Sequence, residues 1–323
     1  TGIYYEQGSE EHVLFETTAG YYEIPGLEES LNPTDIMDRI TAAYHVASTD
    51  SHSAYVFFDK PMMQEMVRKK NIENEFRNAL ETEEFLVYYQ PKVNLKTYTL
   101  AGAEALCRWR HNVDLIPPFH FIPILEEARL IKMLDLYVFE EVCKQINIWK
   151  ERKMRVKPVS INLSRSTLSY HFLADQLLAL ITKHNIDISL LELEVTETAE
   201  VDNQLVFSQA LEKLKEYGFS ISIDDFGVRN ASLSLFTTIN FDILKLDRSL
   251  VKTLAQNQKA RILIRSLAVI CSDLGIKLIA EGVETLEQLD ILKELRCNEV
   301  QGYLFSKPLP LNDFENKYLQ ILR

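Results

Sequence analysis

Two adjacent carboxylates at the end of an expected strand are the residues best suited to chemistry in this chain. Residues 220–223 alternate polar and apolar side chains, and Asp224, Asp225 and Gly227 follow where that strand should end. Neighbouring carboxylates repel each other, so a cation between them would relieve the repulsion. Paired side-chain oxygens favour a hard divalent ion such as Mg²⁺ or Mn²⁺. An isolated pair of this kind is also common in a solvated turn, so the choice between a metal site and a solvated turn depends on the rest of the chain.

Polar side chains recur at the ends of the other expected strands. They are Glu104, Asn162, Glu194, Asp224 with Asp225, Lys245 with Asp247, Glu281 and Gln301. In a β/α barrel the C-terminal ends of the strands line one face, and that face holds the active site. Convergent carboxylates in a closed ring would destabilise the fold without cations. The recurrence therefore favours a metal site over a solvated strand end.

The types of these residues indicate a reaction at phosphorus. Five oxygen-bearing side chains are enough for two octahedral ions: Glu104, Asn162, Glu194, Asp224 and Asp225. Paired metal ions are the arrangement used for in-line displacement at phosphorus. Lys245 could position a nucleophilic water, although an ion pair with Asp247 is an equally good explanation of it. Glu281 is a candidate general base or further metal ligand, and Glu284 and Gln301 could support the ligands from behind.

The elements that must position these residues form a repeating pattern. From residue 84 onward, short apolar strands alternate with amphipathic helical segments, which is typical of β/α repeats. The eight expected strands are 85–93, 100–109, 158–164, 190–197, 220–227, 243–249, 277–284 and 299–305. Eight strands over this length predict a (β/α)8 TIM-like barrel. The first two strands are too close in sequence for a crossover helix, so the first strand should be antiparallel.

The first 60 residues have a different pattern and predict a small α+β fragment. Strands are expected at 12–15, 16–24 and 54–58, and a helix at 35–47 follows a capping residue, Asn32 or Thr34. These elements are too few for a large core, so we expect them to be the C-terminal part of a truncated domain. A connecting helix is expected next. The predicted organisation is 1–60, 61–80 and 81–323.

Composition limits the possible partners. The chain has 323 residues and a formal charge of −12, which argues against a surface for duplex DNA or RNA. No apolar run is long enough for a membrane span, and no signal-peptide pattern is present, so no membrane contact is expected from this chain. The four cysteines are widely separated and form no CxxC pair, which predicts reduced thiols in a cytoplasmic protein. A longer parent protein could still be tethered to a membrane.

Seven motifs in order resemble the bacterial EAL-domain cyclic di-GMP phosphodiesterases. They read EALCRW, INLS, EVTE, DDFG, KLD, EGVE and QGY, and the resemblance covers about residues 70–323. It implies a β/α barrel that hydrolyses one phosphodiester of cyclic di-GMP to linear pGpG with Mg²⁺ or Mn²⁺, two ions being expected and Ca²⁺ inhibiting. A homodimer through this domain is also implied. Upstream, TTAGYYEIP, DIMDRITAAYHVA and AYVFFD resemble the closing part of a GGDEF domain, without the signature loop that cyclase activity needs.

The resemblance also implies roles for individual residues. Glu104, Asn162, Glu194 and Asp224 match the family's first metal shell, and Asp225 matches a ligand of the second metal. Lys245 and Asp247 match a KxD pair whose lysine assists the attacking water, and Glu281 matches the proposed base or ligand. The positions that match ligand-facing residues are Gln90, Leu106, Arg108 and Asp247, with Gln301 at the rim of the site. Glu197 matches the residue that anchors the loop after DDFG.

That loop departs from the family pattern. Active members usually read DDFGTGYSS, whereas this chain has Val228, Arg229 and Asn230 in place of the threonine, glycine and tyrosine. Arginine restricts a turn that glycine permits, and valine supplies no hydroxyl. Two hypotheses therefore stand beside each other: a working phosphodiesterase, and a sensor that binds cyclic di-GMP but scarcely cleaves it. A scaffold that works only through protein contacts is a third, and the ring of carboxylates argues against it.

Overall fold

The chain contains two compact units, Thr1–Phe76 and Arg77–Arg323. The structure, a computed structural model, describes residues 4–6, 9–11, 17–24, 32–49, 55–196, 204–227 and 233–319. The boundary between the units falls inside helix α2 (Lys60–Glu81), which covers the segment where a connecting helix is expected. No helix in these ranges combines the length and the apolar character that crossing a bilayer requires.

The first unit is a small α+β arrangement. Strand β1 (Tyr4–Glu6) pairs antiparallel with β2 (Ser9–Glu11), while β3 (Ala19–Tyr21) pairs in parallel with β4 (Tyr55–Phe57). Helix α1 (Pro33–Thr49) packs on β3 and β4. It includes the helix expected at 35–47, and β4 lies within the strand expected at 54–58. The close approach requires a glycine in β3, because a Cβ there would collide with the backbone of α1. The strand expected at 12–15 lies outside the described residues.

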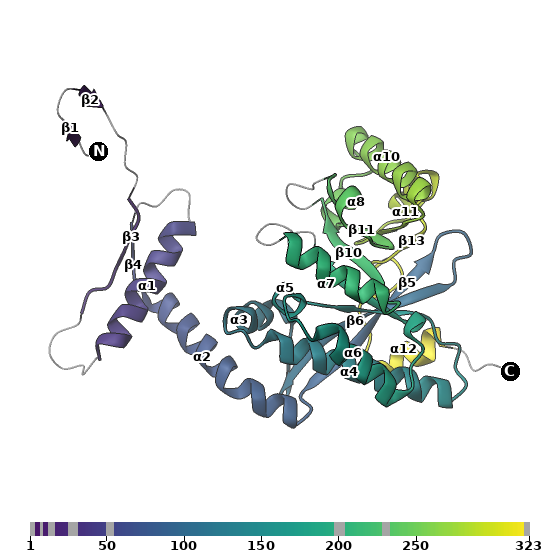
Figure 1. The fold of residues 1–323 in the computed structure, drawn as a ribbon, viewed down its shortest axis with the longest axis horizontal. Helices are drawn as coiled ribbons and strands as arrows, with labels where there is room; N and C mark the ends of the chain where they lie inside the picture. The colour runs from purple at the N-terminus through teal and green to yellow at the C-terminus, as the bar shows by residue number, and fades with distance from the viewer. Residues whose placement is uncertain are drawn as a thin grey trace. The chain divides into compact units, whose positions relative to one another are not determined.

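The second unit is a closed eight-stranded barrel (Figure 1). Its strands are β5 (Phe85–Asn94), β6 (Leu100–His111), β8 (Val159–Asn162), β9 (Leu191–Thr196), β10 (Ser220–Phe226), β11 (Ile243–Leu246), β12 (Lys277–Ala280) and β13 (Glu299–Val300). They pair in the order β5-β13-β12-β11-β10-β9-β8-β6, and β6 closes the ring on β5. All eight lie within or overlap the expected strands, so the predicted TIM-like (β/α)8 fold is confirmed.

The reversed first strand is also confirmed. Strand β5 is antiparallel to both of its neighbours, β6 and β13, while the other barrel pairs are parallel. The short connection from β5 to β6 allows only a hairpin, as the sequence indicates. A further strand, β7 (Asp114–Ile116), extends β6 as a second hairpin that was not expected.

Helices cover the outside of the barrel. They are α3 (Ile122–Glu127), α4 (Ile131–Glu151), α5 (Arg165–Leu168), α6 (Leu173–His184), α7 (Gln204–Glu216), α8 (Leu235–Thr238), α9 (Arg248–Lys252), α10 (Gln258–Leu274), α11 (Leu286–Glu294) and α12 (Leu311–Tyr318), with short 3-10 turns at Pro118–His120 and Ile188–Leu190. Figure 1 shows α4 and α6 side by side. Each has a stripe of buried apolar residues, and α4 contacts strands β5, β6 and β8. A capping box of Thr285 and Gln288 begins α11.

The last helix, α12, is fixed to α4 by one buried carboxylate. Glu315 accepts hydrogen bonds from the indole Nε1 of Trp149 at 2.7 Å and from Gln145 Nε2 at 3.2 Å. Arg152, whose side chain is largely exposed, adds an ion pair at 3.1 Å. Trp149 and Gln145 are buried, so water cannot take the place of Glu315 as the acceptor of their hydrogen bonds.

Replacing Glu315 tests this link. Glu315→Ala leaves two buried donors without an acceptor, and each costs ~1–3 kcal/mol, so we expect the free energy of unfolding to fall by about 2–6 kcal/mol. Urea denaturation measures the change. Glu315→Gln keeps an acceptor oxygen and should lose less than half as much. An equal loss in the two variants would show that the charge, rather than the acceptor, matters.

Candidate functional site

The parallel strands bring the predicted residues to one end of the barrel. The registers place Glu194 of β9 beside Asn162 of β8 and Ser222 of β10, and Glu104 of β6 beside Ser160 of β8. Because the carboxyl ends of these strands meet at the same edge, side chains separated by up to about 200 residues converge. The cluster consists of Glu104, Asn162, Glu194, Asp224, Lys245 and Glu281, with Gln90 and Gln301 beside it.

Lys245 lies at the centre of the acidic cluster and is fully buried. Its Nζ donates to Glu194 Oε2 at 2.8 Å and to Asp224 Oδ2 at 3.0 Å. The same Nζ lies 2.6 Å from Glu281 Oε1 and 3.8 Å from Glu104 Oε2. Burial opposes its charge, but the surrounding carboxylates, Asp224 foremost, raise the pKa of Lys245 well above its ordinary value. Lys245 is therefore a permanent cation among four acids.

The alternative partner of Lys245, Asp247, has another function. The strand ends at Leu246, and the Asp247 side chain accepts a hydrogen bond from the backbone N–H of Ser249 at 2.7 Å. Asp247 thereby caps α9. In the described part of the chain it forms no ion pair with Lys245, so the pairing that the sequence left open is not made.

Glu104 is held by a chain of amides. Asn162 Nδ2 donates to Glu104 Oε1 at 2.9 Å, and Gln301 Nε2 donates to Glu104 Oε2 at 2.5 Å. Gln301 Nε2 also donates to Gln90 Oε1 at 3.0 Å, and Gln90 Nε2 donates to the carbonyl of Ser306 at 3.1 Å. Both oxygens of Glu104 are thus oriented by residues that the sequence assigned to the site.

Three carboxylates of the cluster could bind a metal ion. One oxygen each from Glu104, Glu194 and Asp224 lies within 4.8 Å of the others, and all three residues are buried. Burial and the charge of Glu194 raise the pKa of Glu104 to about 7. Burial works against ionisation of Glu194 too, but Lys245 and Lys92 lower its pKa below the usual range. Crowded carboxylate oxygens of this kind suit a hard divalent cation.

Asp225 and Glu281 border the trio. A register irregularity interrupts the pairing of β10 with β11 between Ile223 and Phe226, and Asp225 has a φ of 58° there. Its side chain is exposed, whereas that of Asp224 is buried, so the bulge separates the two carboxylates. For Glu281, burial raises the pKa well above its usual value although Lys245 opposes the shift. A carboxylate with a raised pKa is a stronger base.

Other predicted residues have different contacts or lie elsewhere. Arg108 is half-buried, donates to the carbonyl of Cys107 at 2.8 Å and stacks over Tyr88. Leu106, two positions earlier on the same strand, is also half-buried. Glu284 pairs with Arg248 at 2.7 Å on the surface. Glu197 and the altered loop at 228–232 lie outside the described residues.

Two interior residues were missed by the sequence analysis. Lys92 of β5 donates to Glu192 Oε1 at 2.7 Å and to Glu194 Oε1 at 2.9 Å. Both glutamates are buried, as is Lys92. A signal existed: Glu192 and Glu194 alternate with leucines in a buried strand, which places both on the inward face. Two inward acids require a cation, and Lys92 is the charged residue inside the first strand.

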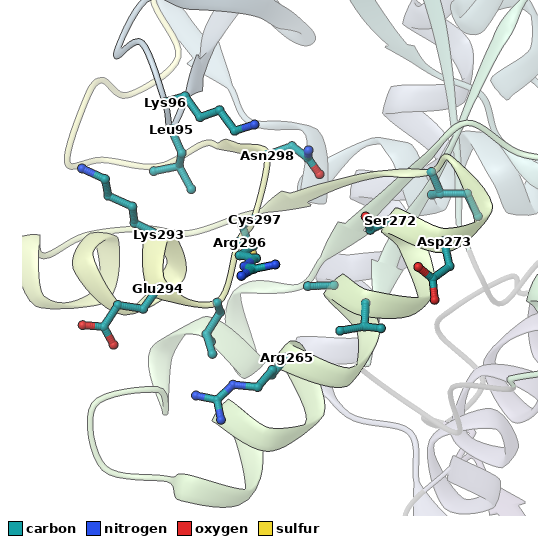
Figure 2. A pocket seen from close by; sticks show the side chains of 14 residues that line it. Leu95, Lys96, Arg265, Ser272, Asp273, Lys293, Glu294, Arg296, Cys297 and Asn298 are labelled. Atoms are coloured by element: carbon teal, nitrogen blue, oxygen red, sulfur yellow. The ribbon is translucent and has the colours of Figure 1, made fainter.

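A large cavity lies away from this cluster. Figure 2 shows its lining, which includes Lys96, Arg265, Lys293 and Arg296, and its volume is about 890 Å³. Ile276 and Asn298, which also line it, precede β12 and β13, so the cavity lies at the N-terminal ends of these strands. No predicted site residue contributes to it. The acidic cluster is therefore at the opposite end, on the face that carries active sites in such barrels.

The fold and site together define a TIM-like barrel with a carboxylate cluster able to hold a metal ion at its catalytic face. Within that class the chain belongs to the EAL domain family, whose sequence model matches residues 73–308. This range includes all eight barrel strands and the whole described cluster.

Known proteins of this family are similar in sequence and structure. The bifunctional diguanylate cyclase/cyclic di-GMP phosphodiesterase MucR of Pseudomonas aeruginosa is 31% identical over 277 residues, which are 85% of this chain and 40% of MucR. A solved PaMucR phosphodiesterase in complex with c-di-GMP has a TM-score of 0.71 and 32% identity, covering 76% of this chain and 99% of that one. The EAL enzyme Bd1971, bound to cAMP and cyclic di-GMP, has a TM-score of 0.73 and 29% identity, covering 84% and 71%. The chain spans less than half the length of the curated relatives it matches.

The raised pKa of Glu104 predicts how the metal-free protein responds to pH. Because the folded state holds this proton more tightly than the unfolded chain, the contribution of Glu104 to stability is fully present at low pH and is lost as the pH rises toward 7. The contribution of Glu104 should fall by about 3 kcal/mol between about pH 4 and pH 7. Chemical denaturation in EDTA gives the free energy of unfolding at each pH. The contribution of Glu104 is the difference in this free energy between the native protein and Glu104→Gln, whose side chain cannot titrate. Parallel pH profiles for the two would contradict the shift.

Proposed function

We propose that this domain is a metal-dependent phosphodiesterase that hydrolyses cyclic di-GMP to linear pGpG. The observation that carries the proposal is the buried trio Glu104, Glu194 and Asp224 around Lys245, at the catalytic face of an EAL-family barrel. Similar proteins are described as cyclic di-GMP phosphodiesterases or are solved with this nucleotide. A small dianionic ligand is compatible with the acidic chain only if cations lie at the site.

The proposed cations are two Mg²⁺ or Mn²⁺ ions. Glu104, Asn162, Glu194 and Asp224 would hold the first, and Asp225 would serve the second. Bound ions supply the positive charge that a phosphodiester needs when its phosphorus is attacked. Ca²⁺ should inhibit, because it prefers longer bonds and more ligands than an octahedral site offers.

The protein groups then have separate tasks in the proposed reaction. The ammonium of Lys245 orients the attacking water and offsets negative charge on the phosphate. Glu281 accepts a proton from that water as the new O–P bond forms and the P–O3′ bond breaks, and the leaving O3′ is protonated to give pGpG. The residues proposed to face the nucleotide are Gln90, Leu106, Arg108, Asp247 and Gln301. The planar guanidinium of Arg108 suits a phosphate oxygen.

Two further assignments concern the rest of the chain. We propose that residues 1–60 are the C-terminal part of a GGDEF-like domain and 61–80 a connecting helix to the EAL barrel at 81–323. A homodimer through the barrel is proposed as well. What supports it is the apolar surface of α10, where Ile262, Val269 and Leu274 are each more than half exposed. A structure of a longer form of the protein in solution would test both assignments.

A turnover assay tests the enzyme. Incubation of the chain with cyclic di-GMP and Mg²⁺ or Mn²⁺ should give pGpG, detected by chromatography. Glu104→Ala should abolish the product, since it removes one ligand of the trio and the acceptor of hydrogen bonds from Asn162 and Gln301. Lys277→Met, at the opposite ends of the strands, serves as the control and should retain activity. Absence of product with both metals at high protein concentration would remove the enzyme assignment.

The altered loop supports a second candidate, a sensor that binds cyclic di-GMP with little turnover. The proposed metal ligands lie on the barrel strands, while residues 228–230 differ from those of active family members. Calorimetry in Ca²⁺ should then show micromolar or tighter binding, with negligible cleavage in Mg²⁺. The triple variant Val228→Thr/Arg229→Gly/Asn230→Tyr should raise turnover if the loop limits it. Unchanged turnover would refute this account of the loop.

A further inference from the structure

Lys92 and Glu192 form a buried ion pair directly beneath the acidic cluster. Lys92 Nζ lies 2.7 Å from Glu192 Oε1 and 2.9 Å from Glu194 Oε1, and the side chains are at most 7% exposed. We propose that this pair is a positioning device that fixes the carboxylate of Glu194 for metal binding. The inference rests on the proposed function, in which Glu194 is a metal ligand, and it assigns a role to two residues outside the metal and substrate shells.

The two oxygens of Glu194 are held by different lysines. Lys92 of β5 donates to Oε1 at 2.9 Å, and Lys245 of β11 donates to Oε2 at 2.8 Å. In the closed sheet β9 lies between these strands, three positions from β5 and two from β11. The carboxylate is thus held from two sides of the barrel and cannot rotate without losing one of the two hydrogen bonds. Such fixation is what an outer partner provides to a metal-ligating carboxylate.

Lys92 is itself fixed in place. Glu192 precedes Glu194 by two residues on the same strand, so both project to the barrel interior. Within the described residues, the Glu192 side chain has one hydrogen-bond and ion-pair partner, and that partner is Lys92. Across the β5–β6 pairing, Lys92 faces Gly102, where a Cβ would lie 2.8 Å from the carbonyl oxygen of Pro158. The lysine stem packs beside this glycine, with its Cδ 3.9 Å from the position that a Cβ would take.

Charge neutralisation alone does not explain the pair. Two apolar side chains of similar volume would stabilise a barrel interior as well as, or better than, a buried ion pair, because they avoid the desolvation of two charges. Apolar side chains cannot, however, donate a hydrogen bond to Glu194 Oε1. Replacing the whole pair should consequently lower metal affinity much more than stability.

The test compares the native chain with the double variant Lys92→Met/Glu192→Met. Its unfolding midpoint in EDTA should change little, because the desolvation that is avoided by removing two buried charges offsets the hydrogen bond that Glu194 Oε1 loses. The Kd for Mn²⁺, measured by calorimetry without nucleotide, should rise about 10–100-fold, as for other lost outer partners of metal ligands. At limiting Mn²⁺ the kcat for cyclic di-GMP should fall by a similar factor, and it should recover as Mn²⁺ is raised.

A matched control removes another ion pair of the barrel. Lys277 and Glu299, on β12 and β13, pair at 3.0 Å at the opposite ends of the strands and do not touch Glu194. Lys277→Met/Glu299→Met should leave the Mn²⁺ affinity unchanged. An equal loss of affinity in this control, or native affinity in the Lys92→Met/Glu192→Met protein, overturns the inference.

Two further outcomes separate this inference from the proposed function. A native chain that binds Mn²⁺ but yields no pGpG contradicts the enzyme, while the Mn²⁺ comparison still decides the role of the pair. A native chain without Mn²⁺ affinity overturns both. If the double variant does not fold, Glu192→Gln decides instead, because it loosens Lys92 and should raise the Mn²⁺ Kd, and an unchanged Kd refutes the positioning role.

Discussion

Repulsion between carboxylates inside a closed barrel is the constraint on which this structure depends. Five acids and two lysines meet in or just below the catalytic mouth: Glu104, Glu192, Glu194, Asp224, Glu281, Lys92 and Lys245. With all groups ionised, negative charges outnumber positive ones by three. In a low-dielectric interior such an excess is costly, and proton uptake by Glu104 or binding of divalent cations relieves it. The same imbalance would favour the binding of a divalent cation by the trio.

Much of the architecture was predictable because its causes are local. The strand patterns, their number and the short connection after residues 85–93 each follow from a few neighbouring residues, and the closed barrel with a reversed first strand followed from them. The location of the site was predictable for the same reason. A polar residue at the end of one strand carries little information, but Glu104, Asn162, Glu194 and Asp224 must meet once the barrel closes.

The features that were not predicted depend on contacts between residues that are far apart in the sequence. Lys92 and Glu194 are about 100 residues apart, and their hydrogen bond exists only because β5 and β9 face each other across the interior. Lys245 and Asp247 had the spacing of a same-face pair, yet β11 ends between them and Asp247 turns to cap α9. The alternation rule holds only while the strand continues. The irregularity at Asp225 likewise arises from pairing with β11, which its own sequence does not reveal.

The acidic cluster and the altered loop belong to different parts of the chain. The trio, its amide supports and Lys92 are attached to strands whose hydrogen bonds close a ring, so the ligand set is rigid. The altered loop begins after Gly227, whose φ of 103° is a conformation that favours glycine. The residues that differ from the family pattern, 228–230, follow this glycine in the sequence, whereas the trio is carried by strands that precede it. The proposed function therefore allows the strand-borne ligands to be retained while substitutions in the loop alter the rate.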